Sequence, residues 1–121
     1  DEMPRKSFQI CTPEGEYVGW CSSYFINEDY DSDKDGDRLA IGIDLPEESA
    51  RGKGLATHAL QLFMAYLHSL GFDELYTQTW SGNERMIRLA EKLGFTECGR
   101  ELKERTVRGR QYDGLTFRIK L

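Results

Sequence analysis

The sequence has few of the residues on which several common kinds of site depend. Its three cysteines, Cys11, Cys21 and Cys98, lack the CxxC spacing, which argues against both a disulfide framework and a zinc site. Because there are only two histidines, most metal or nucleophile sites built from histidine are excluded. No apolar run approaches the roughly 18 residues of a membrane helix, and no signal-peptide pattern opens the chain. These absences predict a reduced, cytoplasmic domain with neither a metal site nor a membrane segment.

Positive charge is also scarce relative to negative charge. The 121 residues include 16 Lys and Arg against 21 Asp and Glu, which gives a formal net charge of −5. This balance argues against bulk electrostatic binding of nucleic acid or of an anionic membrane, and it leaves cationic partners open. Hydrophobic residues make up 39% of the chain, and no repeat or linker divides it. We therefore expect one domain over residues 1–121.

Hydrophobic periodicity predicts a mixed α/β fold. Alternation of apolar residues indicates strands, and apolar residues at three- and four-residue spacing indicate helices. The expected order is strands at 7–11, 17–25 and 39–45, a helix at 55–70, a strand at 74–80, a helix at 83–93, and strands at 96–107 and 111–121. The expected core faces of the two helices are Leu55, Ala59, Phe63, Tyr66, Leu67 and Leu70 in the first, and Met86, Leu89, Ala90 and Leu93 in the second.

Two ways of starting the second helix are open. Ser81 and Glu84 have the spacing of a capping box, in which each side chain bonds to the backbone of the other residue. Asn83 is a rival cap, because an asparagine just before a helix can accept a hydrogen bond from the first turn.

The segment 43–56 carries the main functional signal. A strand ends, a short loop follows, and glycines precede a helix whose first turn has unpaired backbone N–H groups. Gly52 and Gly54 would let a diphosphate approach the backbone, and Arg51 and Lys53 add positive charge beside it. The spacing fits neither the P-loop nor the dinucleotide-binding pattern. A plain helix entry after a flexible loop is the alternative interpretation.

Three motifs resemble those of a known family. Arg51-x-x-Gly54-x-Ala56 is similar to the Arg/Gln-x-x-Gly-x-Gly/Ala signature of the GNAT family of N-acetyltransferases, whose loop holds the diphosphate of acetyl-CoA. Residues 83–95, NERMIRLAEKLGF, resemble the family's Asn-led helix. Residues 109–113, GRQYD, resemble the closing hairpin of the branch that modifies ribosomal-protein N-termini and polyamines. The resemblance runs from about residue 7 to residue 121.

The resemblance implies a fold, a co-substrate and an acceptor. The implied fold is a mixed, mostly antiparallel twisted sheet with helices on its faces. The implied reaction is direct attack of a primary amine on acetyl-CoA in a ternary complex, with a protein N-terminus or a polyamine-like molecule as the acceptor. In this family two strands splay apart and the pantetheine arm lies between them like an added strand. The coenzyme-binding residues implied here are Ile43, Leu45, Arg51, Gly52, Lys53, Gly54, Leu55, Ala56 and Asn83.

The family's usual catalytic tyrosine has no counterpart, because its position is Ala90. A strand N–H near Leu45 would polarise the thioester carbonyl. Asp44, Ser81 and Tyr112 are the predicted proton-transfer residues, with Tyr76 and Cys98 as further candidates for the acid. Glu47 and Glu48 are weaker candidates for the base, and proton removal through water is an alternative. An acid is dispensable if the thiolate leaves readily enough without one.

The family ordinarily begins with a strand and two helices that form one wall of the acceptor cleft. Here the first hairpin starts within about seven residues of the first residue, so that strand and both helices are expected to be missing. We expect either a fragment of a longer chain or an unusually open cleft. A catalytically weak acetyl-CoA-binding sensor or partner-binding module is therefore the alternative function, and a homodimer is left open.

An acidic stretch at 27–37 holds six acidic residues against one lysine. Acids at alternate positions from Asp31 to Asp37 match the opening of a calcium loop, but the position of the bidentate glutamate is Gly42. We therefore expect a solvated loop between strands. Its negative charge suggests the hypothesis that it attracts a cationic amine substrate.

Overall fold

The computed structural model describes residues 7–11, 13–45 and 54–121 of the chain. Over these residues the elements follow the order expected from the sequence, and every bound agrees within one residue. They are β1 (Ser7–Cys11), β2 (Tyr17–Ile26), β3 (Arg38–Asp44), α1 (Leu55–Ser69), β4 (Glu74–Trp80), α2 (Glu84–Leu93), β5 (Thr96–Val107) and β6 (Arg110–Lys120).

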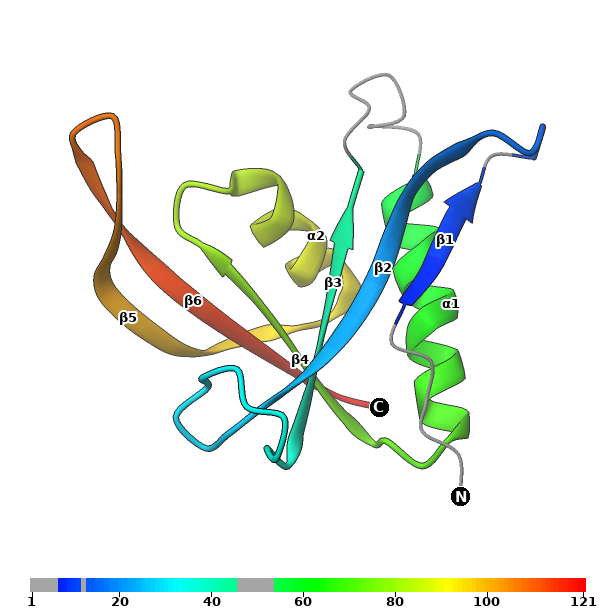
Figure 1. Cartoon of the computed structure of the whole chain (residues 1–121), viewed down its shortest axis with the longest axis horizontal. Helices are drawn as coiled ribbons and strands as arrows, with labels where there is room; N and C mark the ends of the chain where they lie inside the picture. Colours follow the sequence, from blue (N-terminus) through cyan, green and yellow to red (C-terminus); the bar gives the residue numbers. More distant parts are fainter. Residues whose placement is uncertain (1–6, 12, 46–53) are drawn as a thin grey trace.

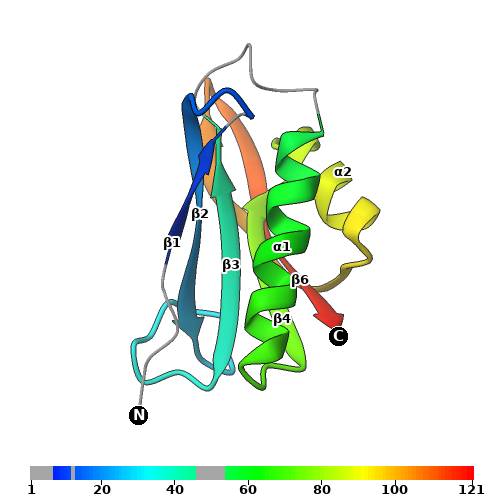
Figure 2. The same ribbon diagram turned by 90° about the vertical axis from the view of Figure 1, so that its right-hand side faces the viewer.

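The strands form one mixed sheet in the order β1-β2-β3-β4-β6-β5 (Figure 1). Only β3 and β4 are parallel, and α1 makes the crossover between them. The other recorded pairs of neighbouring strands are antiparallel. Figure 2 shows both helices on one side of the sheet, which leaves the opposite side uncovered by a helix in the part of the chain described. The predicted sheet type is thus observed, and both helices share a single face.

β3 and β4 pair over a short stretch and then separate. Their register joins Ala40 to Tyr76 and Ile41 to Thr77, although each strand has seven residues. The Thr77 hydroxyl donates a hydrogen bond of 2.8 Å to the Ile41 carbonyl at the last paired position. Figure 1 shows the two strands diverging toward their C-terminal ends, with α2 behind the opening. The structure therefore has a splayed strand pair next to the starts of both helices.

The main core lies between the helices and the sheet. In α1 the buried side chains are Leu60, Phe63, Met64 and Leu67, a run with the i, i+3, i+4, i+7 spacing of one helical face. The sequence analysis placed Phe63 and Leu67 there correctly. It was wrong about Leu70, which follows the last helical turn and is 49% exposed.

Asn83, and not a capping box, starts α2. The Asn83 side chain accepts a hydrogen bond of 3.2 Å from the Met86 backbone N–H. The Ser81 hydroxyl instead accepts a hydrogen bond of 2.9 Å from the backbone N–H of Asp113 on β6. The capping-box interpretation of Ser81 and Glu84 was therefore wrong, because tertiary pairing with β6 engages the Ser81 side chain.

A smaller cluster of buried side chains forms on the uncovered face of the sheet. It consists of Ile26, Ala40 and Tyr76, packed against Tyr24, Tyr30 and Cys98. Because side chains alternate along a strand, Ala40 points to this cluster while its neighbours Leu39 and Ile41 point to the main core. β3 is thus buried on both faces at its centre.

The cap on α2 can be tested by its effect on stability. Asn83→Ala is expected to lower the free energy of unfolding by about 1 kcal/mol, because the Met86 N–H loses its side-chain acceptor. Asn83→Asp keeps an acceptor and should cost much less. Denaturant unfolding of the ligand-free chain measures both. If Glu84→Ala cost more than Asn83→Ala, the capping box would be restored as the helix start.

Candidate functional site

A cavity of about 600 Å³ lies where the end of β3 meets the starts of the two helices. Its walls come from three separate elements: the C-terminal end of β3, the first turn of α1 and one face of α2. The lining residues are Ile43, Asp44, Leu45, Gly54, Ala56, Thr57, Asn83, Arg85, Met86, Arg88, Leu89 and Lys92.

Five of the nine residues expected to bind the coenzyme line this cavity. They are Ile43, Leu45, Gly54, Ala56 and Asn83. Leu55 lies instead on a different hollow, between α1 and β1. Arg51, Gly52 and Lys53 lie outside the described residues, as do Glu47 and Glu48.

The backbone of Ile43 points toward the opening between β3 and β4. The Ile41 carbonyl points toward β4, where the Thr77 hydroxyl bonds to it. Backbone groups two residues apart on a strand point to the same edge, so those of Ile43 point there as well. In the described part of β4, however, the register with β3 is recorded only for Tyr76 and Thr77. A segment lying in this opening could therefore pair with Ile43.

The start of α1 has no side-chain cap from the residues that the structure describes. Gly54 precedes it with φ +75°, a left-handed conformation that favours glycine, and no side-chain cap is recorded among the residues described. The first helical hydrogen bond runs from His58 N–H to Gly54 O at 3.0 Å. The N–H groups of residues 55–57 thus precede the helical ladder, and no acidic residue lies in the first turn. These donors and the helix dipole favour an anion at this position.

One face of α2 adds three cationic side chains to the cavity. Arg85, Arg88 and Lys92 have the spacing i, i+3, i+7, which places them on the same side of the helix. Asp44 is the single acidic residue among the described lining residues. These three cations were not among the predicted site residues, although their helical spacing within 83–93 is a signal that points to them.

The two polar atoms of the Asn83 side chain, Oδ1 and Nδ2, can serve different partners. Its Oδ1 accepts the hydrogen bond from Met86 N–H that caps α2. A hydrogen bond from Asn83 to a ligand in the cavity would then fall to the amide nitrogen.

The three predicted proton-transfer residues lie in different surroundings. Asp44 is exposed at the end of β3 and lines the cavity. Ser81 accepts from Asp113 N–H and lines a separate hollow beside Phe95. The Tyr112 ring packs edge-to-face on Trp80, with the ring centroids 4.8 Å apart. Of the three, Asp44 alone borders the cavity at the strand opening.

The two further candidates, Tyr76 and Cys98, belong to the small cluster on the uncovered face. Tyr76 is 3% exposed, and its hydroxyl donates a hydrogen bond of 2.8 Å to Glu74 Oε1. Burial raises the pKa of Tyr76, and the hydrogen bond to Glu74 raises it further. The hydrogen bond between Tyr30 and Cys98 is the largest of the causes that raise the pKa of Tyr30. Both candidates are thus engaged in packing.

A second cavity, of about 550 Å³, is strongly acidic. The loop after β2 and the strand β5 form its two sides, and Gln78 and Thr79 of β4 also line it. Five carboxylates face it: Glu28, Asp29, Asp31, Glu101 and Glu104. The three acids from the loop belong to the acidic stretch recognised in the sequence, whereas Glu101 and Glu104 of β5 were not predicted to join them.

Fixed contacts shape the β5 side of this acidic cavity. The Glu104 carboxylate lies over Gly114, where a side chain would collide with it. A hydrogen bond with Glu104 raises the pKa of Glu101, and repulsion between the two carboxylates adds to that rise. Arg100 also lines the cavity, but its guanidinium pairs with Glu97 at 3.0 Å and with Asp113 at 2.6 Å.

Gln78 is held in place by three hydrogen bonds. Its Oε1 accepts from the Tyr24 hydroxyl at 2.7 Å, and its Nε2 donates to the Tyr30 carbonyl at 2.7 Å and to Thr116 Oγ1 at 3.2 Å. Burial raises the pKa of Tyr24, so its hydroxyl stays protonated and donates at neutral pH. These contacts tie the acidic loop to the central strands.

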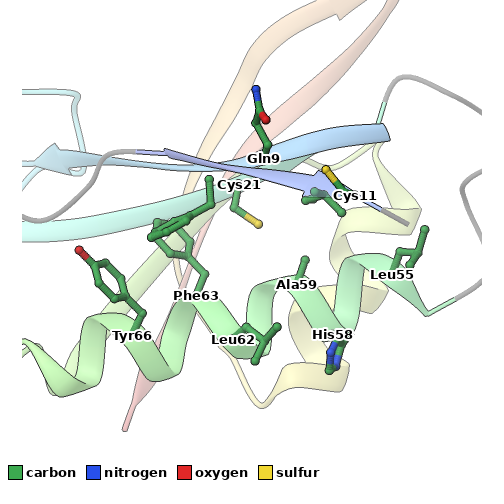
Figure 3. Close-up of a pocket in the computed structure, with 11 residues that line it drawn as sticks. Gln9, Cys11, Cys21, Leu55, His58, Ala59, Leu62, Phe63 and Tyr66 are labelled. Atoms are coloured by element: carbon green, nitrogen blue, oxygen red, sulfur yellow. The ribbon is translucent and has the colours of Figure 1, made fainter. Parts of the chain in front are cut away.

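A third hollow, of about 340 Å³, lies between β1 and α1 (Figure 3). Aromatic side chains dominate it, with Phe8 edge-to-face on both Phe63 and Tyr66 at 5.5 and 5.1 Å. Figure 3 shows the Cys21 side chain directed toward α1 and the Gln9 amide directed away from it. Burial raises the pKa of Cys21 to about 11, so this thiol is almost wholly protonated at neutral pH.

Across 7–11, 13–45 and 54–121, no cluster of three or more His, Cys, Asp or Glu side chains could hold a metal ion. No helix in these ranges is long and apolar enough to cross a bilayer.

In the acidic loop, the Asn27 side chain accepts hydrogen bonds from the backbone N–H groups of Asp29 and Asp31 at 2.9 and 3.1 Å. That side chain therefore orders the turn locally.

Comparison with protein-family models matches residues 1–96 to an acetyltransferase (GNAT) domain. The match covers more than half of the chain, so the chain belongs to the GNAT acetyltransferase family. It is also 35% identical, over 71 residues, to the SPbeta prophage-derived uncharacterized N-acetyltransferase YokL of Bacillus subtilis. This match covers 58% of the chain and 40% of YokL, so the chain spans less than half of that relative.

Solved structures with low sequence identity share the fold. The chain has a TM-score of 0.75 with a ribosomal-protein-alanine N-acetyltransferase from Brucella melitensis, at 23% identity, covering 93% of this chain and 67% of that one. It has a TM-score of 0.75 with mutant forms of the spermidine/spermine N-acetyltransferase SpeG from Vibrio cholerae, at 21% identity, covering 94% and 65%. Against yncA from Salmonella typhimurium, solved with its cofactor acetyl-CoA, the TM-score is 0.72 at 22% identity, covering 88% and 60%. The fold class expected from the sequence is therefore confirmed.

Proposed function

We propose that this chain transfers the acetyl group of acetyl-CoA to a primary amine. The observation that carries the proposal is the cavity at the opening between β3 and β4, into which the uncapped start of α1 and the basic face of α2 both project. Membership of the GNAT family supports the same activity. The cavity offers what the co-substrate needs, namely donors for phosphate oxygens and a strand edge for the amides of pantetheine.

The coenzyme would be held mainly by backbone groups. Its diphosphate would lie at the N–H groups that begin α1, beyond Gly54, where both the donors and the helix dipole favour negative charge. Its pantetheine arm would pair with the backbone of Ile43, as a peptide pairs with an exposed sheet edge. Bound acetyl-CoA would supply the activated acetyl thioester. A strand N–H near Leu45 would then polarise the thioester carbonyl as charge develops on its oxygen.

Proton transfer in this proposal centres on Asp44. An amine attacks only when it is neutral, so its proton must leave, and Asp44 is an exposed carboxylate that lines the cavity. Ser81 and Tyr112 stay predictions, and each would have to change its present contact with Asp113 or Trp80 to act as an acid. Proton removal through water is the alternative to all three.

We propose further that the acceptor is cationic. The five carboxylates of the acidic cavity lie around Gln78 and Thr79, which belong to β4 beyond its last pairing with β3. An amine held there would therefore lie next to the strand opening. Trp80 adds an aromatic face at the end of β4, and Arg105 already lies over its ring at 5.2 Å. Five carboxylates around one cavity suit a polyamine-like molecule or a basic protein N-terminus.

The site of the diphosphate can be tested at Gly54. Gly54→Asp is expected to weaken acetyl-CoA binding by about 30-fold or more, because it places a carboxylate where the proposed diphosphate lies. Gly54→Asn is the matched control, since asparagine has nearly the same shape and tolerates the left-handed conformation equally well. Its affinity should fall by less than about threefold. Calorimetric titration measures both, after circular dichroism has shown both variants folded. Equal affinity of the two variants would place the diphosphate elsewhere.

The acceptor proposal predicts a change in KM. The double variant Glu101→Gln with Glu104→Gln is expected to raise the KM for spermidine by about fivefold to 20-fold at low salt and to change kcat little. The difference should shrink as salt is added, because exposed charges are screened. Glu14→Gln, in the turn after β1, is the control. A KM that stays unchanged and insensitive to salt would contradict the proposal.

The overall activity is tested by following CoA thiol release with a panel of amines. Release that depends on the amine is the expected result. Ala90 favours the second candidate function, a catalytically weak acetyl-CoA-binding sensor or partner-binding module, because this residue occupies the family's usual tyrosine position and is fully buried. Tight acetyl-CoA binding with no thiol release for any amine in the panel would support that second function.

A further inference from the structure

The basic face of α2 is a second anion-binding feature in the cavity, distinct from the start of α1. Arg85, Arg88 and Lys92 all line the cavity and are all exposed. The ion pairs recorded among the described residues involve Arg38, Arg100 and Arg118, and none involves these three.

The three cations are neighbours of like charge on one side of α2. Residues three or four positions apart on a helix are neighbours, so the three cations repel one another along this face. The two acidic residues of α2 do not relieve the repulsion in the cavity: Glu91 lines the separate hollow beside Ser81, and Glu84 is not among the lining residues. Among the described residues that line this cavity, Asp44 is the single acidic residue against these three cations. In a chain with a net charge of −5, this local excess of positive charge indicates a ligand with negative charge.

The proposed co-substrate carries two separate anionic groups. One is the diphosphate, which the N–H groups at the start of α1 suit by close backbone approach. The other is the 3′-phosphate on the ribose, a phosphomonoester with up to two negative charges. Guanidinium groups bind such a phosphate through paired N–H donors, and a lysine adds a point charge.

We infer that Arg85, Arg88 and Lys92 bind the ribose 3′-phosphate of the coenzyme. This inference rests on the proposed function, and it assigns these residues the selection of CoA over its dephosphorylated form. The main competing arrangement is that the basic face binds the diphosphate instead. In that case removal of the 3′-phosphate would change nothing at this face.

The inference is tested by combining a change in the protein with a change in the ligand. The ligands are acetyl-CoA and acetyl-dephospho-CoA, which differ by the 3′-phosphate alone. The proteins are the wild-type chain, the triple variant Arg85→Gln, Arg88→Gln and Lys92→Gln, the single variant Arg88→Gln, and Lys120→Gln as a control of equal charge change at the end of β6. Dissociation constants are measured by calorimetry near 0.15 M salt, where long-range effects are screened.

The expected result is that the triple variant loses affinity for acetyl-CoA and keeps its affinity for acetyl-dephospho-CoA. The wild-type chain should bind acetyl-CoA about tenfold more tightly than acetyl-dephospho-CoA, and the triple variant should bind the two about equally. The dissociation constant of acetyl-dephospho-CoA should rise by less than about twofold in the triple variant. Arg88→Gln should lose part of the preference, and Lys120→Gln should keep it. The substituted side chains are exposed, so all variants should fold.

The outcomes separate this inference from the proposed function. If the wild-type chain binds both coenzymes equally, or if the triple variant weakens both equally, the assignment of the 3′-phosphate is overturned and acetyl-CoA binding stands. If the folded wild-type chain binds neither coenzyme, the proposed function falls and the inference falls with it.

Discussion

The hydrogen bond from the Thr77 hydroxyl to the Ile41 carbonyl marks the point on which the site depends. Beyond it β3 and β4 no longer share a recorded register, yet a buried carbonyl at the end of a strand pair must still find a donor. A side chain of β4 supplies that donor, so the strands can separate without leaving Ile41 unpaired. The separation brings the end of β3, the start of α1 and one face of α2 around a single cavity. A β-branched polar residue at position 77 thus serves both the fold and the site.

Local patterns were sufficient for the elements and for many residues of the cavity at the end of β3. Periodicity located each strand and helix, the glycine before α1 was recognised as part of a helix start, and Asn83 was one of the two alternatives for the start of α2. The positions of Ser81 and Tyr112 could not be foreseen, because they depend on β6, about thirty residues further along the chain than Ser81. The Glu101 and Glu104 pair likewise requires an irregularity in β5, where Lys103 has φ +56° and its N–H bonds to Asp113. Long-range pairing decides such positions, and a single sequence does not display it.

The formal charge of −5 conceals a separation of charge within the molecule. Three cations of α2 gather at the cavity beside the helices, while five carboxylates gather at the other cavity, between the loop after β2 and the strand β5. Under the proposed function a polyanionic coenzyme and a cationic amine would each meet a surface of opposite charge, and each surface would repel the other reactant. Such complementarity favours correct binding and faster association more than it favours tight binding. The net charge of the whole chain, considered alone, indicates only the cationic amine and not the anionic coenzyme.

Ala90 raises the question of whether the proposed reaction needs a side-chain acid. Its side chain is fully buried in the main core, so this position supplies no acid. Under the proposed function this is tolerable, because a thiolate is a far better leaving group than an amine or an alkoxide. The proposed reaction would still need a neutral amine, a polarised carbonyl and a fixed approach of the two reactants. Fixed approach alone can account for a large share of a rate enhancement, since it converts an encounter of two molecules into a step within one complex. A site built from a strand edge, a helix start and two charged surfaces can provide that positioning even with few proton-transfer groups.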